Sequence, residues 1–325
     1  MSRRTHFPKT GEDRQLDAYW RATLRGPLFT EVRLAGSAWT ARPWASLAKD
    51  GAVTDRRLDG VIVEGEPVEV DDAVRGHQAF AKSVPRWREE GRACEVIEVK
   101  PGLSEWVLGQ ALVGRWLFER QVGLPISRTT VLARHQDPAM VWAAGKLRIE
   151  TANPRQPPKQ VPMRSRFHYG LHDAQLQRIE RYRRELGGEG TWLTRVPLAG
   201  PAWKPDGGKA SAAQTYVPFM RVPGESSAGV IVFEPRHRSL LDAEALDLVC
   251  VGRRKLGRGA LGLVASYSLF FEQQYGRAPS KCTIICGQTD LAVEAACRAI
   301  GGTMRIPPVD VVEVGEVGAA DPEAS

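Results

Sequence analysis

The residues best suited to chemistry are Glu98 and Lys100, which stand two positions apart in the stretch Cys94-Glu-Val-Ile-Glu-Val-Lys100. Apolar and polar residues alternate there as in a buried strand, so the two charged side chains would share one face of a sheet. Desolvating a carboxylate and an ammonium together is costly. Two interpretations compete: a charged pair on a solvated sheet face, or a catalytic pair with a second carboxylate nearby.

Asp59 is the candidate second carboxylate, in the stretch Arg56-Arg-Leu-Asp-Gly-Val-Ile-Val63, which is typical of a strand. Two carboxylates on neighbouring strands suit Mg²⁺ or Mn²⁺, because such an ion prefers oxygen ligands and also accepts water and substrate phosphate. The ion can activate a water and polarise a phosphodiester. Lys100 would orient that water or neutralise charge developing on the phosphate.

The elements that must position these residues form a mixed α/β sheet. We expect helices at 11–24, 104–122 and 137–145, strands at 28–34, 56–63, 94–100 and 126–133, and an irregular polar stretch at 64–92. Short connections favour antiparallel pairing of the first three strands, and the long helix makes the fourth strand parallel to its partner. Trp106 and Trp116 of the long helix are expected in the core in preference to forming a platform on which bases stack.

The second half of the chain repeats the first. The matching segments, in the same order, are 26–39 with 190–203 (eight of fourteen positions identical), 60–63 with 229–232, and 96–123 with 249–276 without gaps. This pattern indicates a tandem duplication, and two copies of one α/β unit would pack as a pseudo-dimer. We expect a first unit at 1–150, a Pro-rich basic linker at 151–170, a second unit at 171–308 and an acidic disordered tail at 309–325.

The first copy carries polar residues that its repeat lacks, although the framework of Gly, Leu, Val and Trp persists. The aligned pairs are Asp59 with Ala228, Glu98 with Val251, Lys100 with Arg253, and Gln110 with Leu263. Carboxylates that disappear together indicate one shared task, performed by the first copy alone.

Asp59, then Glu98-Val99-Lys100 at a strand end, then a helix bearing Gln110, resemble the PD-(D/E)XK nuclease superfamily. The order helix, three strands, helix, strand is similar to the core of that superfamily. The resemblance implies a restriction-endonuclease-like fold for both copies, with a degenerate second copy. Some members add an acid from the first helix, which Glu12 or Asp17 would supply.

The same resemblance implies a role for each of these side chains. Asp59 and Glu98 would be metal ligands, Lys100 the catalytic lysine, and Gln110 an auxiliary polar residue on the following helix. The cofactor would be Mg²⁺ or Mn²⁺.

A net charge of +7 favours a polyanionic partner, nucleic acid first. Where the first copy has its acids, the second has a basic run that would bind nucleic acid near a helix N-terminus, or form a solvated basic face. These residues are Arg253, Arg254, Lys255 and Arg258, joined by Arg178, Arg181, Arg183 and Arg184 on the preceding helix. No apolar run approaches the roughly 18 residues that span a bilayer. Five cysteines without a CxxC pair suggest reduced thiols in a cytoplasmic protein.

The sequence therefore favours a metal-dependent endonuclease that hydrolyses phosphodiester bonds of DNA, in preference to RNA, with a single active site in the first copy. Double-strand cleavage would then require a homodimer. An alternative is a catalytically silent nucleic-acid-binding or regulatory protein with a nuclease-like fold. A third is a structural partner protein that neither binds nor cuts nucleic acid.

Overall fold

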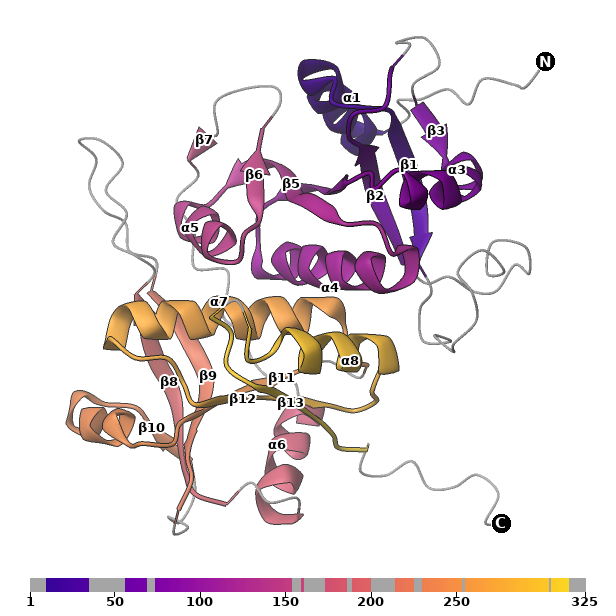
Figure 1. Cartoon of the computed structure of the whole chain (residues 1–325). Helices are drawn as coiled ribbons and strands as arrows, with labels where there is room; N and C mark the ends of the chain where they lie inside the picture. The colour runs from indigo at the N-terminus through magenta and orange to yellow at the C-terminus, as the bar shows by residue number, and fades with distance from the viewer. Residues whose placement is uncertain are drawn as a thin grey trace, which may run out of the picture. The chain divides into compact units, whose positions relative to one another are not determined.

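The computed structural model describes residues 10–34, 56–68, 74–153, 159–160, 173–185, 189–199, 214–224, 230–252, 255–303 and 305–315. The chain divides into two compact units, Met1–Val161 and Pro162–Ser325. Each unit is built on one mixed sheet with helices packed against it (Figure 1), so the predicted α/β class with two units is confirmed.

The first unit comprises α1 (Gly11–Thr23), β1 (Leu28–Leu34), β2 (Arg56–Val63), β3 (Val74–Gly76), α3 (His77–Glu89), β4 (Cys94–Gly102), α4 (Glu105–Val122), β5 (Ile126–Gln136), α5 (Pro138–Lys146), β6 (Glu150–Ala152) and β7 (Lys159–Gln160). The strand order is β3-β1-β2-β4-β5-β6, and β7 also pairs with β5. As predicted, β1, β2 and β4 pair antiparallel, and β4 and β5 are parallel across the α4 crossover.

The stretch 64–92, predicted to be irregular, contains β3 and α3, so that prediction was wrong. Phe80, Val84 and Trp87 are buried at the i, i+4, i+7 spacing of one helix face. Pro85 lies inside α3, where a proline normally interrupts a helix because it lacks an N–H. Sequence analysis missed this helix because it contains a proline and many charged residues, and because only three of its side chains are buried.

Helices cover both faces of the first sheet. On one face, Leu16 and Tyr19 of α1 pack against Ile97 and Val99 of β4. Because side chains alternate along a strand, Glu98 points to the opposite face, over which α4 runs along β4 and β5. Glu98 is thereby placed between the sheet and α4.

The second unit comprises α6 (Asp173–Glu185), β8 (Thr191–Ala199), β9 (Gln214–Val222), β10 (Val230–Val232), the 3₁₀ helix η1 (Pro235–Asp242), β11 (Asp247–Val251), α7 (Arg258–Tyr275), β12 (Lys281–Cys286), α8 (Leu291–Ile300) and β13 (Val309–Glu313). Its strand order, β10-β8-β9-β11-β12-β13, reproduces that of the first unit, with the same strand directions.

Two of the predicted boundaries are corrected by strands at the sheet edges. The predicted tail began at 309, but β13 pairs with β12, and the following Val314 is buried. The predicted linker began at 151, but β6 and β7 belong to the first sheet. The acidic composition around β13 and the Pro-rich composition around β6 and β7 hid these strands from sequence analysis. Short strands at a sheet edge bury few side chains, so they need few apolar residues.

The strand pairing also corrects the alignment of the two copies. Residues 26–39 and 190–203 match one for one, so the partners of β1 and β8 identify equivalent positions on the next strand. By this register Asp59 of β2 corresponds to Pro218 of β9. Val230–Val232, which the sequence alignment paired with β2, forms β10 and occupies the position of β3.

A second shift affects β4. The β2–β4 and β9–β11 registers pair each residue of β4 with a residue of β11 that lies one position earlier than the gapless alignment gave. The reason is that the second copy has one extra residue between β11 and α7. The helices α4 and α7 both have 18 residues, so the alignment holds there. The corrected pairs are Glu98 with Cys250, Lys100 with Gly252, and Gln110 with Leu263. The second unit still lacks every one of these polar residues.

Candidate active site

The candidate site lies where β2 and β4 cease to pair. Their antiparallel ladder ends at Gly60 and Ile97. Beyond that point the Asp59 carboxylate takes the place of a strand carbonyl, and its Oδ2 accepts the Val99 N–H at 2.7 Å. On its other side β4 stays paired with β5 as far as Gly102. We call this place, lined by Asp59, Glu98 and Lys100, the sheet fork.

An unusual backbone conformation on β1 contributes to the fork. Glu31 has φ of +54°, and its counterpart Arg195 in the second unit has φ of +57°. Such a left-handed conformation costs a non-glycine residue about 1–2 kcal/mol. It interrupts the regular pairing beside Asp59 and beside Pro218. The irregularity therefore belongs to the fold of both units, whereas the carboxylate occurs in the first alone.

Three oxygen atoms converge on the Lys100 ammonium. Its Nζ donates to Asp59 Oδ2 at 2.8 Å and to the Val99 carbonyl at 2.8 Å, and it lies 3.9 Å from Glu98 Oε2. The Glu98 side chain is 2% exposed, whereas those of Asp59 and Lys100 are 23% and 25% exposed. The fork is therefore closed around Glu98 and open to solvent at Asp59 and Lys100.

The charge of Lys100 follows from its surroundings. Burial lowers the pKa of the ammonium, but Asp59, and then Glu98 and Glu12, raise it, and the net result is a pKa above the ordinary 10.5. Lys100 is therefore a cation at neutral pH. It can donate hydrogen bonds and balance negative charge, but it cannot act as a general base there.

The same interaction distinguishes the two acids proposed from the first helix. Glu12, in the first turn of α1, acts electrostatically on Lys100. Asp17 instead pairs with Arg21 one turn later on α1, at 3.0 Å. Of these two acids, Glu12 is the one whose charge acts on Lys100.

Helix α4 closes the fork over Glu98. A Cβ added to Gly114 would lie 3.4 Å from Glu98 Oε1 and 2.9 Å from a Leu58 methyl, so the helix backbone passes directly over the carboxylate. Gln110 precedes Gly114 by one turn on the same ridge of the helix. Its Oε1 is buried and accepts no hydrogen bond from any described residue. The structure thus brings Asp59, Glu98 and Lys100 into contact, and it places Gln110 one helical turn from the residue of α4 that lies over Glu98.

The donor set of the fork fits Mg²⁺ in its chemistry, since two carboxylates and the Val99 carbonyl are hard oxygen ligands. Within the described ranges, no three His, Cys, Asp or Glu side chains gather as a metal-binding group. Asp59, Glu98 and the carbonyl would therefore be the protein's share of the ligands. Water and substrate phosphate would complete the shell, as is usual for this ion.

The predicted basic site of the second unit is only partly described. Arg253 and Arg254 lie outside the described residues. Lys255 is exposed and approaches Asp290 at 3.7 Å, and Arg258 is the first residue of α7. Lys255 and Arg258 therefore lie at the start of α7, and the carboxylate of Asp290 is close to Lys255.

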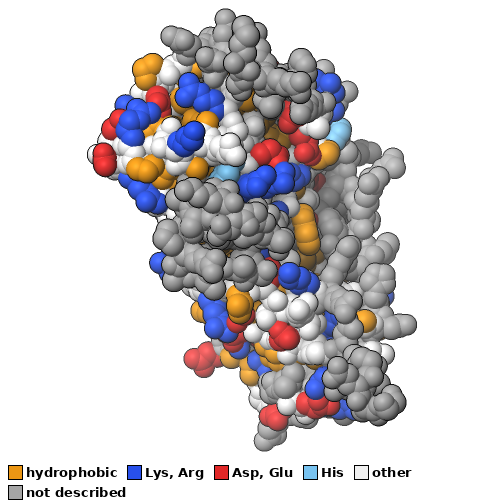
Figure 2. All heavy atoms as spheres, turned by 90° about the vertical axis from the view of Figure 1, so that its right-hand side faces the viewer, with side chains coloured by type: hydrophobic (Ala, Val, Ile, Leu, Met, Phe, Trp, Pro, Cys, Tyr) orange, Lys and Arg blue, Asp and Glu red, His pale blue; other side chains and the backbone are white. Residues whose placement is uncertain are grey.

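The arginines of α6 do not form an unneutralised patch. Arg178 is buried and donates to the Gly252 carbonyl. The other three pair with acids of the same helix: Arg181 with Glu185, and Arg183 and Arg184 with Glu180. On the face drawn in Figure 2, described Lys and Arg side chains are interspersed with Asp and Glu. A role of α6 in binding nucleic acid remains a prediction.

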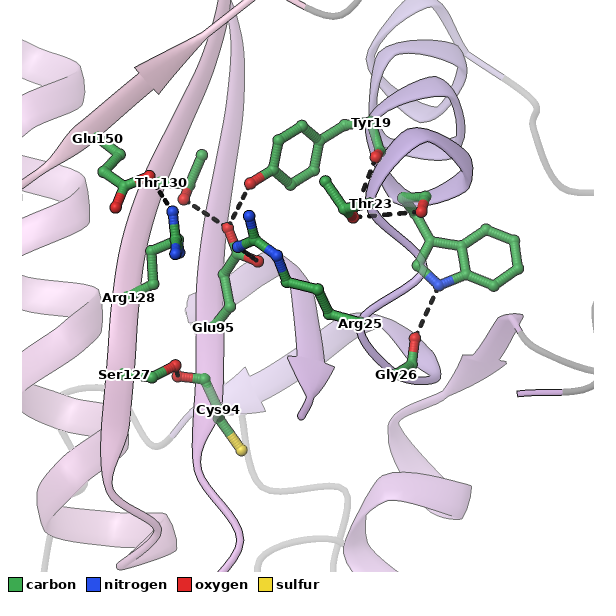
Figure 3. Close-up of polar contacts among 11 residues, drawn as sticks. Tyr19, Thr23, Arg25, Gly26, Cys94, Glu95, Ser127, Arg128, Thr130 and Glu150 are labelled. Atoms are coloured by element: carbon green, nitrogen blue, oxygen red, sulfur yellow. Dashed lines mark hydrogen bonds and ion pairs between the residues drawn. The ribbon is translucent and has the colours of Figure 1, made fainter. Parts of the chain in front are cut away.

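A buried carboxylate on β4 that the sequence did not single out is Glu95 (Figure 3). It accepts hydrogen bonds from Tyr19 Oη at 2.7 Å and Thr130 Oγ1 at 2.5 Å, and Arg25 Nη1 lies 3.5 Å away. Burial, followed by the bond to Glu95, raises the pKa of Tyr19 to about 12. Tyr19 therefore keeps its proton at neutral pH, and its hydrogen bond to Glu95 ties α1 to the sheet.

The second unit contains a related arrangement around a buried acid. Asp247, at the position of Glu95 by register, accepts from Thr283 Oγ1 at 2.8 Å and pairs with Arg221 at 3.0 Å. An acid present in both copies serves their common fold. The gapless alignment began at Val96 and left Glu95 out, and only the strand register reveals this match.

Comparison of the chain with protein-family models, curated proteins and solved structures found no match. Among the described residues, no helix is both long enough and apolar enough to cross a membrane. Function must therefore be inferred from the geometry and chemistry of the site, since a fold alone does not specify it.

Proposed function

We propose that the protein is a Mg²⁺- or Mn²⁺-dependent nuclease that hydrolyses phosphodiester bonds of DNA in the sheet fork. The observation that supports this most is the convergence of oxygens from Asp59, Glu98 and Val99 on the Lys100 ammonium. The second unit keeps the strand order but has apolar or small residues at these positions, namely Pro218, Cys250 and Gly252. Groups that the fold does not need, gathered in one place, are candidates for chemistry.

Each residue has a definite task in this proposal. Asp59, Glu98 and the Val99 carbonyl would hold the cation, which when bound supplies positive charge to the phosphate and acidifies a water. Lys100, an ammonium with exposure to solvent, would donate to the attacking water or to a phosphate oxygen as negative charge develops. Gln110, with its buried Oε1, would orient a ligand or water at the α4 side of the fork.

The test is cleavage of supercoiled plasmid by the whole chain with Mg²⁺, with Mn²⁺ and with EDTA. We expect metal-dependent nicking, because one chain carries one site, and a loss of about 100-fold or more in Glu98→Gln and Lys100→Met. Asp17→Asn, which removes an acid of α1 outside the fork, is the matched control and should cut normally. Absence of cleavage by the wild type with either metal, or full activity of Glu98→Gln, would refute the proposal.

One observation favours the silent alternative as a second candidate. Asp59 Oδ2 already accepts hydrogen bonds from Val99 N and Lys100 Nζ, so this carboxylate oxygen is satisfied without a metal. A regulatory or binding protein would keep that arrangement permanently. Salt-sensitive DNA binding by the wild type, combined with no cleavage in any metal, identifies this case.

A further inference from the structure

Trp106 is unusually exposed for a tryptophan. Half of its surface (50%) is accessible, although its neighbours Glu105 and Val107 are buried. The expectation that it belongs to the core was therefore wrong. The first turn of α4 turns its buried side to the sheet and presents the indole to solvent. Tryptophan is enriched at interfaces, because its ring is apolar and its N–H can still find a partner.

The position of Trp106 relates it to the sheet fork. Trp106, Gln110 and Gly114 follow one another at intervals of four, along a single ridge of α4. Gly114 lies against Glu98, Gln110 is partly buried, and Trp106 is exposed. The ridge thus runs from the buried carboxylate to solvent, over about 12 Å of helix. Trp106 stands at its open end.

The comparison between the two units shows that the fold does not need this ring. The counterpart of Trp106 in α7 is the buried Gly259, and that of Gln110 is Leu263. Both helices have the same length and end in a left-handed glycine. Trp106 therefore joins Asp59 and Glu98 among the residues found only in the unit with the candidate site.

We infer that Trp106 stacks on an unpaired base of the substrate, and hence that the preferred substrate is single-stranded DNA or an unpaired end. This inference rests on the proposed nuclease function. Stacking of a base on an aromatic side chain is tolerant of sequence, because every base has a π-face. Within a duplex those faces are covered by neighbouring bases, and a base must first leave the stack to be reached.

The geometry also limits which base is bound. Nucleotides of one strand are spaced about 3.4 Å apart along a duplex axis, and the ridge covers about 12 Å. The stacked base therefore belongs to a nucleotide within about four of the phosphate that lies in the fork. In an extended single strand the nucleotides are spaced more widely, so fewer of them separate the stacked base from that phosphate.

The experiment measures binding without cleavage, in EDTA, by fluorescence anisotropy of labelled oligonucleotides. Single-stranded and blunt duplex forms of one sequence are titrated with the whole chain and its variants. We expect Trp106→Ala to weaken single-strand binding about 10-fold, and Trp106→Phe to retain most of it. Duplex binding should change less than twofold. Trp116→Ala, on the same helix and packed beside Arg120, is the matched control and should bind as the wild type does.

A second measurement reports stacking directly. An oligonucleotide carrying 2-aminopurine should lose fluorescence on binding the wild type, and keep it with Trp106→Ala. Equal single-strand affinity of wild type and Trp106→Ala, an equal loss for duplex, or no binding of single strands by the wild type would each overturn the inference. The binding samples contain EDTA, so their result does not depend on cleavage. If Trp106→Ala weakens single-strand binding as expected but the wild type does not cleave plasmid, the nuclease function alone is refuted.

Discussion

Asp59 Oδ2 lies 2.8 Å from Lys100 Nζ and also accepts the Val99 N–H, so one carboxylate oxygen replaces a strand pairing and neutralises a lysine. Two further acids, Glu98 and Glu12, act on the same ammonium. Without Lys100 these carboxylates would repel one another in a partly buried site. The lysine is thus both a structural counterion and a candidate catalytic group, and the two roles can be separated by experiment.

Lys100→Met should make thermal stability depend on divalent cations. The substitution leaves two acids of the fork without their ammonium, and a bound cation stabilises the folded state by mass action. We expect the Tm of Lys100→Met to fall without metal and to rise with Mg²⁺ or Mn²⁺ by more than that of the wild type. Glu98→Gln is the control, since it removes a ligand. Equal Mg²⁺ responses in the wild type and Lys100→Met would contradict the placement of the cation.

Glu12→Gln should lower the pKa of Lys100, because one of the charges that raise it is removed. A lysine whose folded pKa exceeds its unfolded value stabilises the protein below pH 10.5, and that contribution is lost as pH rises through the folded pKa. Urea unfolding from pH 8 to 11 should therefore show an earlier loss of stability in Glu12→Gln than in the wild type. Asp17→Asn, whose acid pairs with Arg21, should behave as the wild type does.

Glu105 should make the protein less stable as pH rises through neutrality. Burial, and then the charge of Asp137, raise the pKa of this carboxyl from 4.5 to about 7. A raised carboxyl pKa means that the folded state holds the proton longer, so stability falls between pH 4.5 and about 7 and stays low above that. The full difference corresponds to about 3 kcal/mol.

Glu105→Gln should remove most of this pH dependence and stabilise the protein at pH 8, because a neutral amide replaces a buried charge. Urea unfolding at pH 5 and pH 8 measures both quantities. A wild type whose stability is flat between these pH values, or rises, would show that Glu105 is not held protonated. Exposed Glu185 of α6, changed to Gln, is the control for the loss of one acid.

Gly114→Ala should damage both fold and site. The added Cβ would approach a Leu58 methyl at 2.9 Å and Glu98 Oε1 at 3.4 Å, so the helix or the carboxylate must move. Overpacking of this kind costs about 1–3 kcal/mol. Gly145→Ala of α5 is the matched control, because its Cβ meets nothing within 4 Å and alanine favours a helix. Cleavage by Gly114→Ala at the wild-type rate would show that α4 does not position Glu98.

Tyr19→Phe should weaken the fold and leave the chemistry intact. Removing the hydroxyl deprives the buried Glu95 of a hydrogen bond of 2.7 Å, which costs about 1–3 kcal/mol. The midpoint of urea unfolding should fall accordingly. Plasmid cleavage per folded molecule should stay within about twofold of the wild type, since a buried acid bonded to a threonine occupies this position in both units. A selective loss of cleavage would assign Glu95 to the site.

Strong local patterns identified most of the first sheet. The alternation around Glu98 and the helical spacing after Ser104 correspond to β4 and α4, because each buries a continuous apolar face. Helix α3 was missed, since three buried residues and an internal proline leave little periodicity. The same limit applies to β13, a short edge strand in an acidic stretch.

By itself, the sequence determined the α/β class, the repeat, and the polar residues Asp59, Glu98, Lys100 and Gln110 that one copy alone contains. These are local or comparative properties, which residue type and spacing carry directly. Tertiary structure alone decided that strands β2 and β4 part at Asp59, that the charge of Glu12 acts on Lys100 while Asp17 pairs with Arg21, and that Trp106 is exposed. Each of these depends on strand register or on which face of a helix meets the sheet. A shift of one residue moves a strand side chain to the opposite face and turns a helix side chain by about 100°.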